Sequence, residues 1–351
     1  MEKLVLTGVG MVTPMGIGRE QFWNNVINGS SGIKRLTKFP TTHETYCGEI
    51  SDFHFDVSIS NNRFRRAADI SKYTLTAVNL AISDAGTKTL DDKDTALVVG
   101  ITHGALNYAQ TFHKALVTEG VDDLSPIHFS DSVLNAPAGN VSIGFGIKGP
   151  IHTLVGGATT AIKAVMLASR MLDSGVASKS IVVSSEALNE LSLYCYSRLG
   201  IHTLSEGSGA ILIEKEGKIT GTTPYCYIAG MASGINPSNS CTALNTVVDQ
   251  CLEKADISPK DIDLVMTDSC VPVKSGLTDI PAGCIMPLSG NAFSLTVMLD
   301  IIVSSLAIKN GTIPEAIVRN AVSISDSLQN VLIYSTEEDG IAAAMVLSKC
   351  L

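Results

Sequence analysis

The sequence has few of the residues that build metal centres, disulfide frameworks or nucleic-acid surfaces. Its eight cysteines include no C-x-x-C pair, so neither a zinc site nor a set of disulfides is expected. Acidic residues outnumber basic ones by 34 to 25, and the net charge of -9 argues against a nucleic-acid partner. No apolar run is long enough to span a membrane, and the first residues lack the pattern of a secretion signal. We therefore expect a cytoplasmic protein that binds no metal, membrane or nucleic acid.

Apolar residues are plentiful, since 45% of the 351 residues are hydrophobic, which is enough to bury a large core. Strand-like apolar runs alternate with segments of helical period, which predicts an α/β fold with a largely parallel sheet covered by helices. The pattern partly restarts after Gly217, so we expect two βαβαβ halves, residues 1–217 and 218–351, in one compact unit. Strands are expected within 4–16, 95–104, 152–155, 178–190, 206–217, 226–234 and 264–273 and in a pair ending at 349, and helices within 19–29, 68–86, 106–120, 159–175, 241–263 and 292–311.

The stretch Gly149–Val165 has the order of a catalytic corner. A Gly-Pro turn leads into a short strand, which turns on Gly156 and Gly157 into a helix that opens at Ala158. Such a corner aims the backbone N–H groups of the helix start at whatever occupies it, and enzymes place nucleophiles and oxyanion donors there. Neither Gly157 nor Ala158 carries a nucleophile. The question is why this corner lacks one.

Seven stretches in a fixed order resemble the β-ketoacyl synthase family, and together they cover nearly the whole chain. The resemblance implies the thiolase fold, in which two pseudo-duplicated halves form a layered α-β-α-β-α architecture. The stretches are VLTGVGMVTPMG followed by QFWNNVINGSSGI, SKYTLTAVNLAISDAG, NAPAGNVSIGFGIKGP, the corner stretch, EGSGAILIE, LEKADISPKDIDLV, and SGNAFSLTVMLDIIVSSLAIKNGTIP.

The family's reaction uses a corner cysteine that takes the acyl chain and two later histidines that act in decarboxylation of the extender and stabilise the enolate. By resemblance, Ala158 stands in the place of the cysteine, Ser269 or its neighbour in that of the first histidine, and Asn291 in that of the second. The family's glycine-rich GFGG loop falls on residues 337–340. None of the histidines lies in the C-terminal half: they are His43, His54, His103, His113, His128, His152 and His202.

A chain without this cysteine and both histidines cannot run the family's reaction alone, so we expect no enzyme activity of its own. It resembles most the chain-length factor, the inactive β subunit that pairs with an active ketosynthase in type II polyketide systems. Many chain-length factors carry Gln at the corner, where this chain has Ala158. The resemblance implies an active ketosynthase and an acyl carrier protein as partners, in a polyketide or polyene pathway. No cofactor is implied except the carrier's phosphopantetheine.

The resemblance also implies which residues would shape the acyl tunnel and the dimer seam. The tunnel wall would come from residues 103–112 and 129–135, and the strand 151–155 would form part of the seam. A longer or shorter cavity would then let the partner add more or fewer units. The expected tunnel and interface residues are His103, Leu106, Phe112, Phe129, Leu134, Asn135, His152 and Leu154.

Two other functions remain open from the sequence. A thiolase-fold scaffold could bind an acyl carrier protein or acyl chains without setting their length, docking the acidic carrier on Arg63, Arg65 and Arg66. An independent enzyme with new catalytic residues is the other possibility.

Several polar residues have simpler structural explanations. We expect His152 to be a buried histidine with satisfied hydrogen bonds and Glu206 to be structural. His103 and His113 are expected on a helix surface or an interface. The run 337–339, Glu-Glu-Asp, is expected to be a solvated turn, and Cys270 and Cys284 are not expected to be nucleophiles, because no histidine follows to activate them.

Overall fold

The computed structural model describes residues 2–350, apart from residues 42, 56–61, 88–89, 91–92, 123, 220–221, 239, 270–275 and 321–327. Within the described residues the main strands form one 11-stranded sheet, which confirms the predicted thiolase-like α/β fold class. The N-terminal side of the sheet has the order β6 (Ile151–Val155), β5 (Thr95–Ile101), β7 (Lys179–Glu186), β8 (Gly207–Lys215) and β1 (Leu4–Thr13). It continues through β9 (Cys226–Ile235), β13 (Ile341–Ser348), β12 (Asn330–Thr336), β10 (Leu264–Thr267) and β11 (Ala282–Gly283).

The sheet is mixed, which corrects the expectation of a largely parallel one. The outer strands pair in parallel, β5 with β6 and β7, and β10 with β11 and β12. The central strands β7, β8, β1, β9, β13 and β12 pair antiparallel in that order. Parallel pairing needs a long crossover, whereas β12 and β13 are joined by a tight turn that permits only antiparallel pairing. Outward from the β1–β9 contact, each side has two antiparallel pairings followed by two parallel ones.

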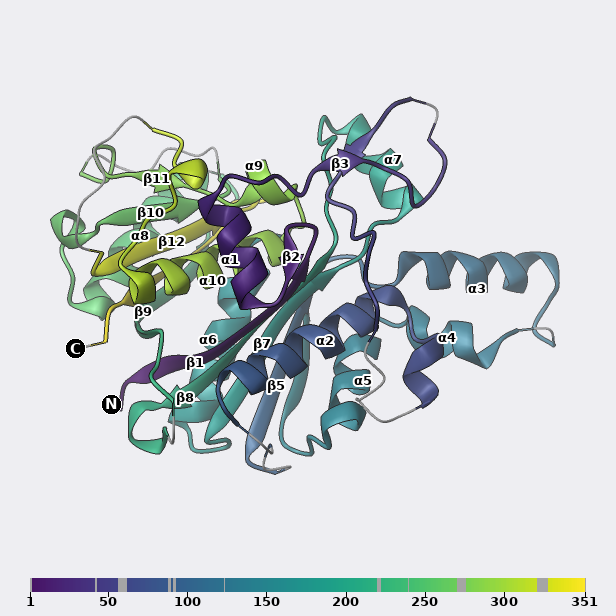
Figure 1. Cartoon of the computed structure of the whole chain (residues 1–351), viewed down its shortest axis with the longest axis horizontal. Helices are drawn as coiled ribbons and strands as arrows, with labels where there is room; N and C mark the ends of the chain where they lie inside the picture. Colours follow the sequence, from purple (N-terminus) through teal and green to yellow (C-terminus); the bar gives the residue numbers. More distant parts are fainter. Residues whose placement is uncertain are drawn as a thin grey trace.

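Helices sit between and outside the two sides of the sheet (Figure 1). The inner layer is α6 (Thr160–Asp173) with α10 (Ser294–Asn310), which pack against each other. Every residue of α10 from Ser294 to Ile308 is buried, because strands of both halves cover it. Outside lie α2 (Asp69–Asp84) and α5 (Ala136–Phe145) on the N-terminal strands, and α8 (Ser240–Ala255) on β9 and β13. This arrangement is the expected α-β-α-β-α layering.

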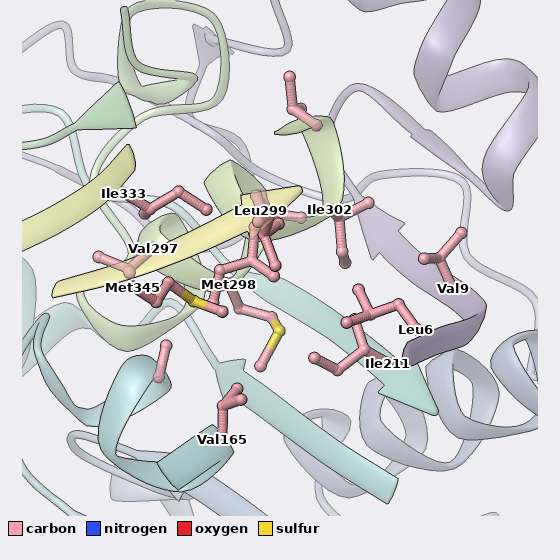
Figure 2. Packing of buried hydrophobic residues seen from close by; sticks show 14 of the residues in the cluster. Leu6, Val9, Val165, Ile211, Val297, Met298, Leu299, Ile302, Ile333 and Met345 are labelled. Carbon is pink, nitrogen blue, oxygen red and sulfur yellow. The ribbon is translucent and has the colours of Figure 1, made fainter. Parts of the chain in front are cut away.

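The largest hydrophobic cluster joins the two halves. Figure 2 shows Met298, Leu299 and Ile302 of α10 among residues from strands of both halves, with Val165 of α6 close by. All four side chains are at most 2% exposed. Burying a side chain of this size contributes about 1.5–3 kcal/mol, so this cluster fixes α6 and α10 relative to each other. The start of α6, where the corner lies, is therefore held by a rigid support.

The remaining elements are short or peripheral. In Figure 1, α3 (Leu106–Thr118) and α4 (Pro126–Ser132) extend from the body, and no residue of α3 is buried. No helix among the described residues is both long and apolar enough to cross a membrane. The expected strand 264–273 ends as β10 at Thr267, and its residues 270–273 lie outside the described part. The other elements are α1 (Arg19–Ile27), α7 (Glu190–Arg198), α9 (Met286–Ser289), β2 (Gly16–Ile17), β3 (Lys34–Arg35) and β4 (Tyr46–Cys47).

Candidate active-site corner

The corner is built as the sequence predicts. Strand β6 ends at Val155, the Gly156 N–H donates to the Ile101 carbonyl at 3.1 Å, and α6 begins at Thr160. Ala158 is half-buried against the main hydrophobic cluster. A Cβ atom on Gly157 would lie 2.7 Å from a carboxylate oxygen of Glu337, so a larger residue there would have to displace the glutamate side chain. The place of a nucleophile is therefore occupied by small, unreactive residues and faced by a carboxylate.

That carboxylate corrects the expectation that residues 337–339 are a solvated turn. Glu337 begins the tight turn between β12 and β13, and its Oε1 accepts the backbone N–H of Thr159 at 3.1 Å. The same oxygen accepts the Thr159 hydroxyl. A carboxylate at a helix N-terminus meets unsatisfied N–H groups and the positive end of the helix dipole. Only Glu338 and Asp339 of the run are exposed, as expected.

Asn291 lies just before α10, and its side chain hydrogen-bonds within that turn. Its Oδ1 accepts the Phe293 N–H at 2.9 Å, and its own N–H donates to the Thr203 carbonyl at 2.9 Å. Phe293 has a φ of 52°, a left-handed conformation that is strained for a residue with a side chain. The Asn291 amide supports this unusual turn into α10, so its oxygen is committed to structure.

Ser269 and its neighbour Asp268 follow β10. The Ser269 hydroxyl lies 2.6 Å from that of Thr336 at the end of β12, and its N–H donates to Thr267 Oγ1 at 3.0 Å. Asp268 Oδ1 is sealed from solvent and has no hydrogen-bond partner. Burial raises the Asp268 pKa to about 6, while the nearby Ser335 side chain and the charge of Arg319 lower it and the charge of Glu337 adds a smaller increase. Of the two residues, Asp268 therefore has the more perturbed environment.

A second buried carboxyl, Asp300, lies on the inner helix α10. Its Oδ1 accepts the Ile285 N–H at 2.9 Å, while its Oδ2 is buried without a partner. Burial raises the Asp300 pKa to about 8 and the Cys284 pKa well above its usual value. At neutral pH the Cys284 thiol is therefore protonated and not a nucleophile, as the sequence predicted. The position of Cys270 lies outside the described residues.

Of the carboxyl groups in this region, Glu337 contacts the corner itself. Asp268 feels the charges of Glu337, Asp300 and Arg319, so these groups share one electrostatic environment. A carboxylate repels the malonyl carboxylate and the enolate oxygen that the family's histidines would stabilise. In the part of the chain that the structure describes, no group of three His, Cys, Asp or Glu side chains is placed to hold a metal ion.

Sequence reasoning missed Asp300 and the inward direction of Glu337. A single charge in the apolar run VMLDIIV is the signal that could have identified Asp300. No local signal could have identified Glu337, because its partner Thr159 lies 178 residues earlier in the chain.

Among the expected tunnel residues, His103 has the most defined surroundings. Its Nδ1 lies 3.2 Å from Glu186 Oε2 and its Nε2 lies 2.9 Å from the Tyr196 hydroxyl. Its ring packs edge-on against Phe293, with the centroids 5.0 Å apart. Glu186 also accepts the backbone N–H groups of Thr102 and His103. His103 is therefore clamped at the end of β5, and Glu186, Tyr196 and Phe293 are clamp residues that the sequence analysis did not identify.

The other expected wall residues lie on the projecting segment. Phe112 of α3 and Phe129 of α4 are in ring contact at 5.4 Å, and Phe129 is 56% exposed. Leu134 packs beside Gly104, next to His103, and is 40% exposed. Leu106 begins α3 half-buried, and Asn135 precedes α5 on the surface. His113 is exposed on α3, as expected. The structure thus pairs Phe112 with Phe129 and Leu134 with the His103 turn.

Strand β6 forms an open edge of the sheet, which corrects the expectation for His152. Within the described residues β6 pairs only with β5, and His152 is exposed instead of buried. An edge strand leaves one row of backbone groups and part of its side chains open to solvent. Ile151 and Val155 are 38% and 54% exposed, while Leu154 packs against the main cluster. An apolar open edge of this kind is suited to pairing with another chain.

The expected carrier-docking arginines lie in a short 3₁₀ helix, Asn62–Arg66. Arg65 and Arg66 are exposed, and the Arg66 carbonyl accepts the Tyr108 hydroxyl at 3.0 Å. The side chain of Arg63 lies outside the described part of the chain. The structure therefore places a basic patch of Arg65 and Arg66 beside the start of α3.

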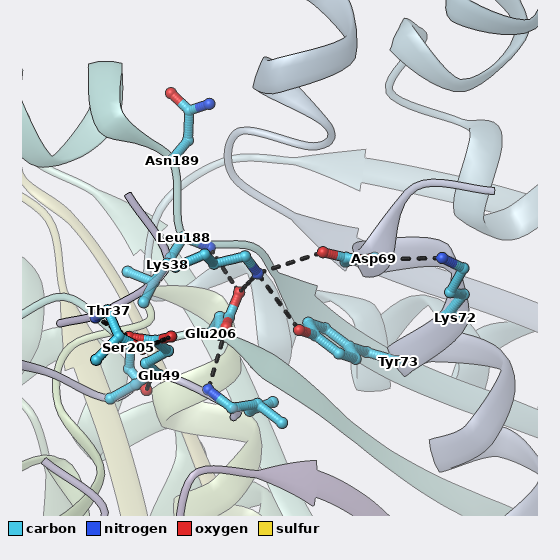
Figure 3. Close-up of polar contacts among 12 residues, drawn as sticks. Thr37, Lys38, Glu49, Asp69, Lys72, Tyr73, Leu188, Asn189, Ser205 and Glu206 are labelled. Atoms are coloured by element: carbon cyan, nitrogen blue, oxygen red, sulfur yellow. Dashed lines mark hydrogen bonds and ion pairs between the residues drawn. The ribbon is translucent and has the colours of Figure 1, made fainter. Parts of the chain in front are cut away.

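Glu206 is structural, as expected. Its carboxylate accepts from the Lys38 ammonium, 2.7 Å away, and from the Leu188 N–H at 3.1 Å (Figure 3). It also accepts the Ile50 N–H at 3.1 Å. Lys38 also contacts Asp69 at 3.3 Å and the Tyr73 hydroxyl at 3.5 Å. This network ties the segment around residues 38–50 to α2 and to the turn before α7.

The layered fold and the corner define a thiolase-like synthase core, and comparisons with known proteins agree. Residues 1–215 match the family model for the β-ketoacyl synthase N-terminal domain, so the chain belongs to the β-ketoacyl synthase family. It is 25% identical to a 3-oxoacyl-[acyl-carrier-protein] synthase 2 of Rhizobium meliloti, over 76% of this chain and 73% of the relative. It is 23% identical to the actinorhodin polyketide putative beta-ketoacyl synthase 2 of Streptomyces coelicolor, over 88% of this chain and 86% of the relative.

Solved structures show the same fold. The ishigamide ketosynthase/chain length factor superposes with a TM-score of 0.88 at 16% identity, covering 100% of both chains. The AntDE:AntF complex, a type II polyketide acyl-carrier protein with its ketosynthase bound to the hexaketide, gives a TM-score of 0.81 at 18% identity, over 99% of this chain and 100% of the other.

Proposed function

We propose that this chain is a non-catalytic, chain-length-determining subunit that pairs with an active ketosynthase in type II polyketide or polyene biosynthesis. The observation that carries the proposal is the corner: Ala158 stands at the helix start, and the Glu337 carboxylate occupies the donors that an acyl oxygen would need. Its relatives include proteins named as synthases, but this chain has no histidine after His202. In this proposal the partner supplies the cysteine and both histidines.

The open edge of β6 supports a partner of the same fold. Pairing two such edges would extend the sheet across the interface and bury Ile151 and Val155, which are exposed here. The projecting α3 and α4 pack against each other and carry the contact between Phe112 and Phe129 (Figure 1). A partner's acyl chain reaching this seam would meet the His103 clamp and the Phe112 side chain, which would set the length at which growth stops.

Co-expression with an active type II ketosynthase tests the proposal. We expect the two chains to co-purify and to give the mass of a heterodimer in native mass spectrometry. The acyl carrier protein should join only when the ketosynthase is present. A chain that remains a monomer or homodimer beside several such ketosynthases would contradict the proposal. Binding of the carrier by the chain alone would instead support the scaffold function, with Arg65 and Arg66 as the docking patch.

Phe112→Ala in the reconstituted complex tests whether the proposed tunnel wall limits product length. Removing the ring opens space beside Phe129, so we expect longer products by mass spectrometry, with the total turnover largely unchanged. Val117→Ala is the matched control, because Val117 lies on the same helix and is 84% exposed. If both variants keep the wild-type product distribution, the Phe112 side chain does not limit the length.

A further inference from the structure

We propose that Glu337 is a specificity-determining residue that keeps acyl groups out of this chain's own corner, its carboxylate acting as an internal occupant of the site for an acyl carbonyl or an extender carboxylate. The inference rests on the proposed function and deepens it, because it explains how carrier-borne acyl groups are reserved for the partner's reactive corner. It is carried by the contacts of Glu337 with the start of α6.

Glu337 occupies the hydrogen-bond donors at the start of α6. A helix start that receives a nucleophile offers backbone N–H groups to the oxygen of the acyl group. Here the Thr159 N–H donates to Glu337 Oε1 at 3.1 Å, and the Thr159 hydroxyl donates to the same atom. The charge of the carboxylate also offsets the positive end of the α6 dipole. An incoming acyl oxygen would have to displace an anion that is already bound.

Glu337 also fills the space beside Gly157. The Glu337 carboxyl lies against Gly157, and a Cβ atom there would come within 2.7 Å of Oε2 and 2.8 Å of Cδ. The cavity left by the missing side chain of Gly157 is thus filled by the glutamate. Ala158 beside it adds only a methyl group, so the corner is closed both sterically and electrostatically.

Backbone hydrogen bonds hold the turn that carries Glu337. The Glu337 N–H donates to the Ile341 carbonyl at 2.8 Å, and the Gly340 N–H donates back to the Glu337 carbonyl at 3.0 Å. Gly340 has a φ of 80°, and its carbonyl accepts the Asn236 N–H at 3.0 Å. The turn is therefore fixed between β12 and β13, and the carboxylate reaches the corner without rearrangement.

The charge of Glu337 acts on the neighbouring carboxyl group of Asp268. Asp268, whose Oδ1 is buried and unpartnered, lies within the electrostatic influence of Glu337, and Arg319 is the cation that acts on both Asp268 and Asp300. A malonyl group would bring a further carboxylate into this environment. Removing Glu337 lowers the repulsion and frees the Thr159 donors together.

A reporter thiol tests the proposal on the full-length chain. In Ala158→Cys the new thiol lies at the start of α6, where a free helix end lowers a cysteine pKa but a neighbouring carboxylate raises it. Iodoacetamide alkylates this thiol at neutral pH, and peptide mass spectrometry follows the rate. We expect alkylation to be about tenfold faster in A158C/E337A than in A158C, because a change of one pKa unit changes the thiolate population tenfold. A158C/E338A is the matched control, because Glu338 lies on the same turn and is exposed.

A second measurement keeps Ala158 in place. Acetyl-pantetheine is added to the wild-type chain, Glu337→Ala and Glu338→Ala, and contact with the protein is detected by saturation-transfer NMR. We expect transfer only with Glu337→Ala. Equal alkylation rates in the three thiol variants, or equal transfer in the three native-corner proteins, would overturn the proposal. Neither readout involves the ketosynthase partner, so failure of the heterodimer and failure of the Glu337 occupant are separate results.

Discussion

Two glutamates in this chain join distant segments, and their surroundings differ in one respect. Glu206 is fully buried and faces the Lys38 ammonium at 2.7 Å as well as two backbone N–H groups. Glu337 is half-buried and faces a helix N-terminus and a hydroxyl but no cation within salt-bridge distance among the described residues. A buried carboxylate with a counter-ion and satisfied oxygens is a structural link. A carboxylate held only by helix-start donors occupies a place where a ligand could bind.

The same difference extends to the neighbours of each glutamate. Lys38 also reaches Asp69, so the first region distributes one ammonium over two carboxylates. In the second region Asp268 and Asp300 each keep a buried oxygen without a hydrogen-bond partner. Unsatisfied buried oxygens cost stability and occur where a site has another purpose. The second region therefore bears a cost in stability that the first region, with its paired carboxylate, avoids.

The largest effect should come from removing the cation of the first region. Lys38→Met leaves the Glu206 carboxylate buried without its counter-charge, which should lower the free energy of unfolding by about 3 kcal/mol. Lys72→Met is the control, because the Lys72 ammonium pairs at 3.6 Å with Asp69, whose side chain is 43% exposed, and its removal should cost less than about 1 kcal/mol. Urea denaturation followed by circular dichroism measures both. Equal losses would mean that the Lys38–Glu206 pair is no more structural than a surface contact.

The second effect concerns the buried carboxyl groups behind the corner. The folded-state pKa of Asp300 is raised to about 8 by burial, above the value of about 3.9 in an unfolded chain. The folded state therefore binds more protons between these values, and this group's contribution to stability, complete below pH 4, is lost as the pH rises toward 8. Asp300→Asn removes the titration and keeps the acceptor for the Ile285 N–H. Between pH 5 and pH 8 the wild type should lose on the order of 3 kcal/mol relative to the variant.

Thermal unfolding of both proteins across this pH range measures the difference. Parallel stability curves would show that Asp300 is ionised in the folded protein at neutral pH. Asp268, with a pKa of about 6, should contribute a smaller slope of the same sign, visible in Asp268→Asn.

The two regions also show how far the sequence alone reaches. The β6–α6 corner follows from a local order of strand, glycines and helix, so its position and its lack of a nucleophile at Ala158 are predictable. The structural role of Glu206 was expected only from the family resemblance, because its partner Lys38 lies 168 residues away. This contact joins distant segments of the N-terminal half, and it depends on the tertiary fold, which no periodicity records.

The same reason explains the errors. His152 lies in a run of apolar residues that resembles a buried strand, but β6 is an edge strand and leaves it exposed. The sheet was expected to be largely parallel because strands alternate with helices, whereas the central strands pair antiparallel. The inward direction of Glu337 depends on the approach of the β12–β13 turn to α6, which only the assembled inner layer of α6 and α10 determines.

The smallest effect, and the one that separates the two glutamates most sharply, is the stability contribution of Glu337. Glu337→Ala removes a charged group from a helix N-terminus, which should cost about 1 kcal/mol in the free energy of unfolding, whereas Glu338→Ala should stay within about 0.5 kcal/mol of wild type. A double-mutant cycle with Thr159→Ala isolates the contact between the hydroxyl and the carboxylate, and chemical denaturation of the four proteins should give a coupling of about 1 kcal/mol. A coupling near that of the Lys38–Glu206 pair would make Glu337 a structural link of the same kind. A modest coupling, together with a fully folded Glu337→Ala chain, would mean that the fold does not need this carboxylate, which is what a role in excluding a ligand requires.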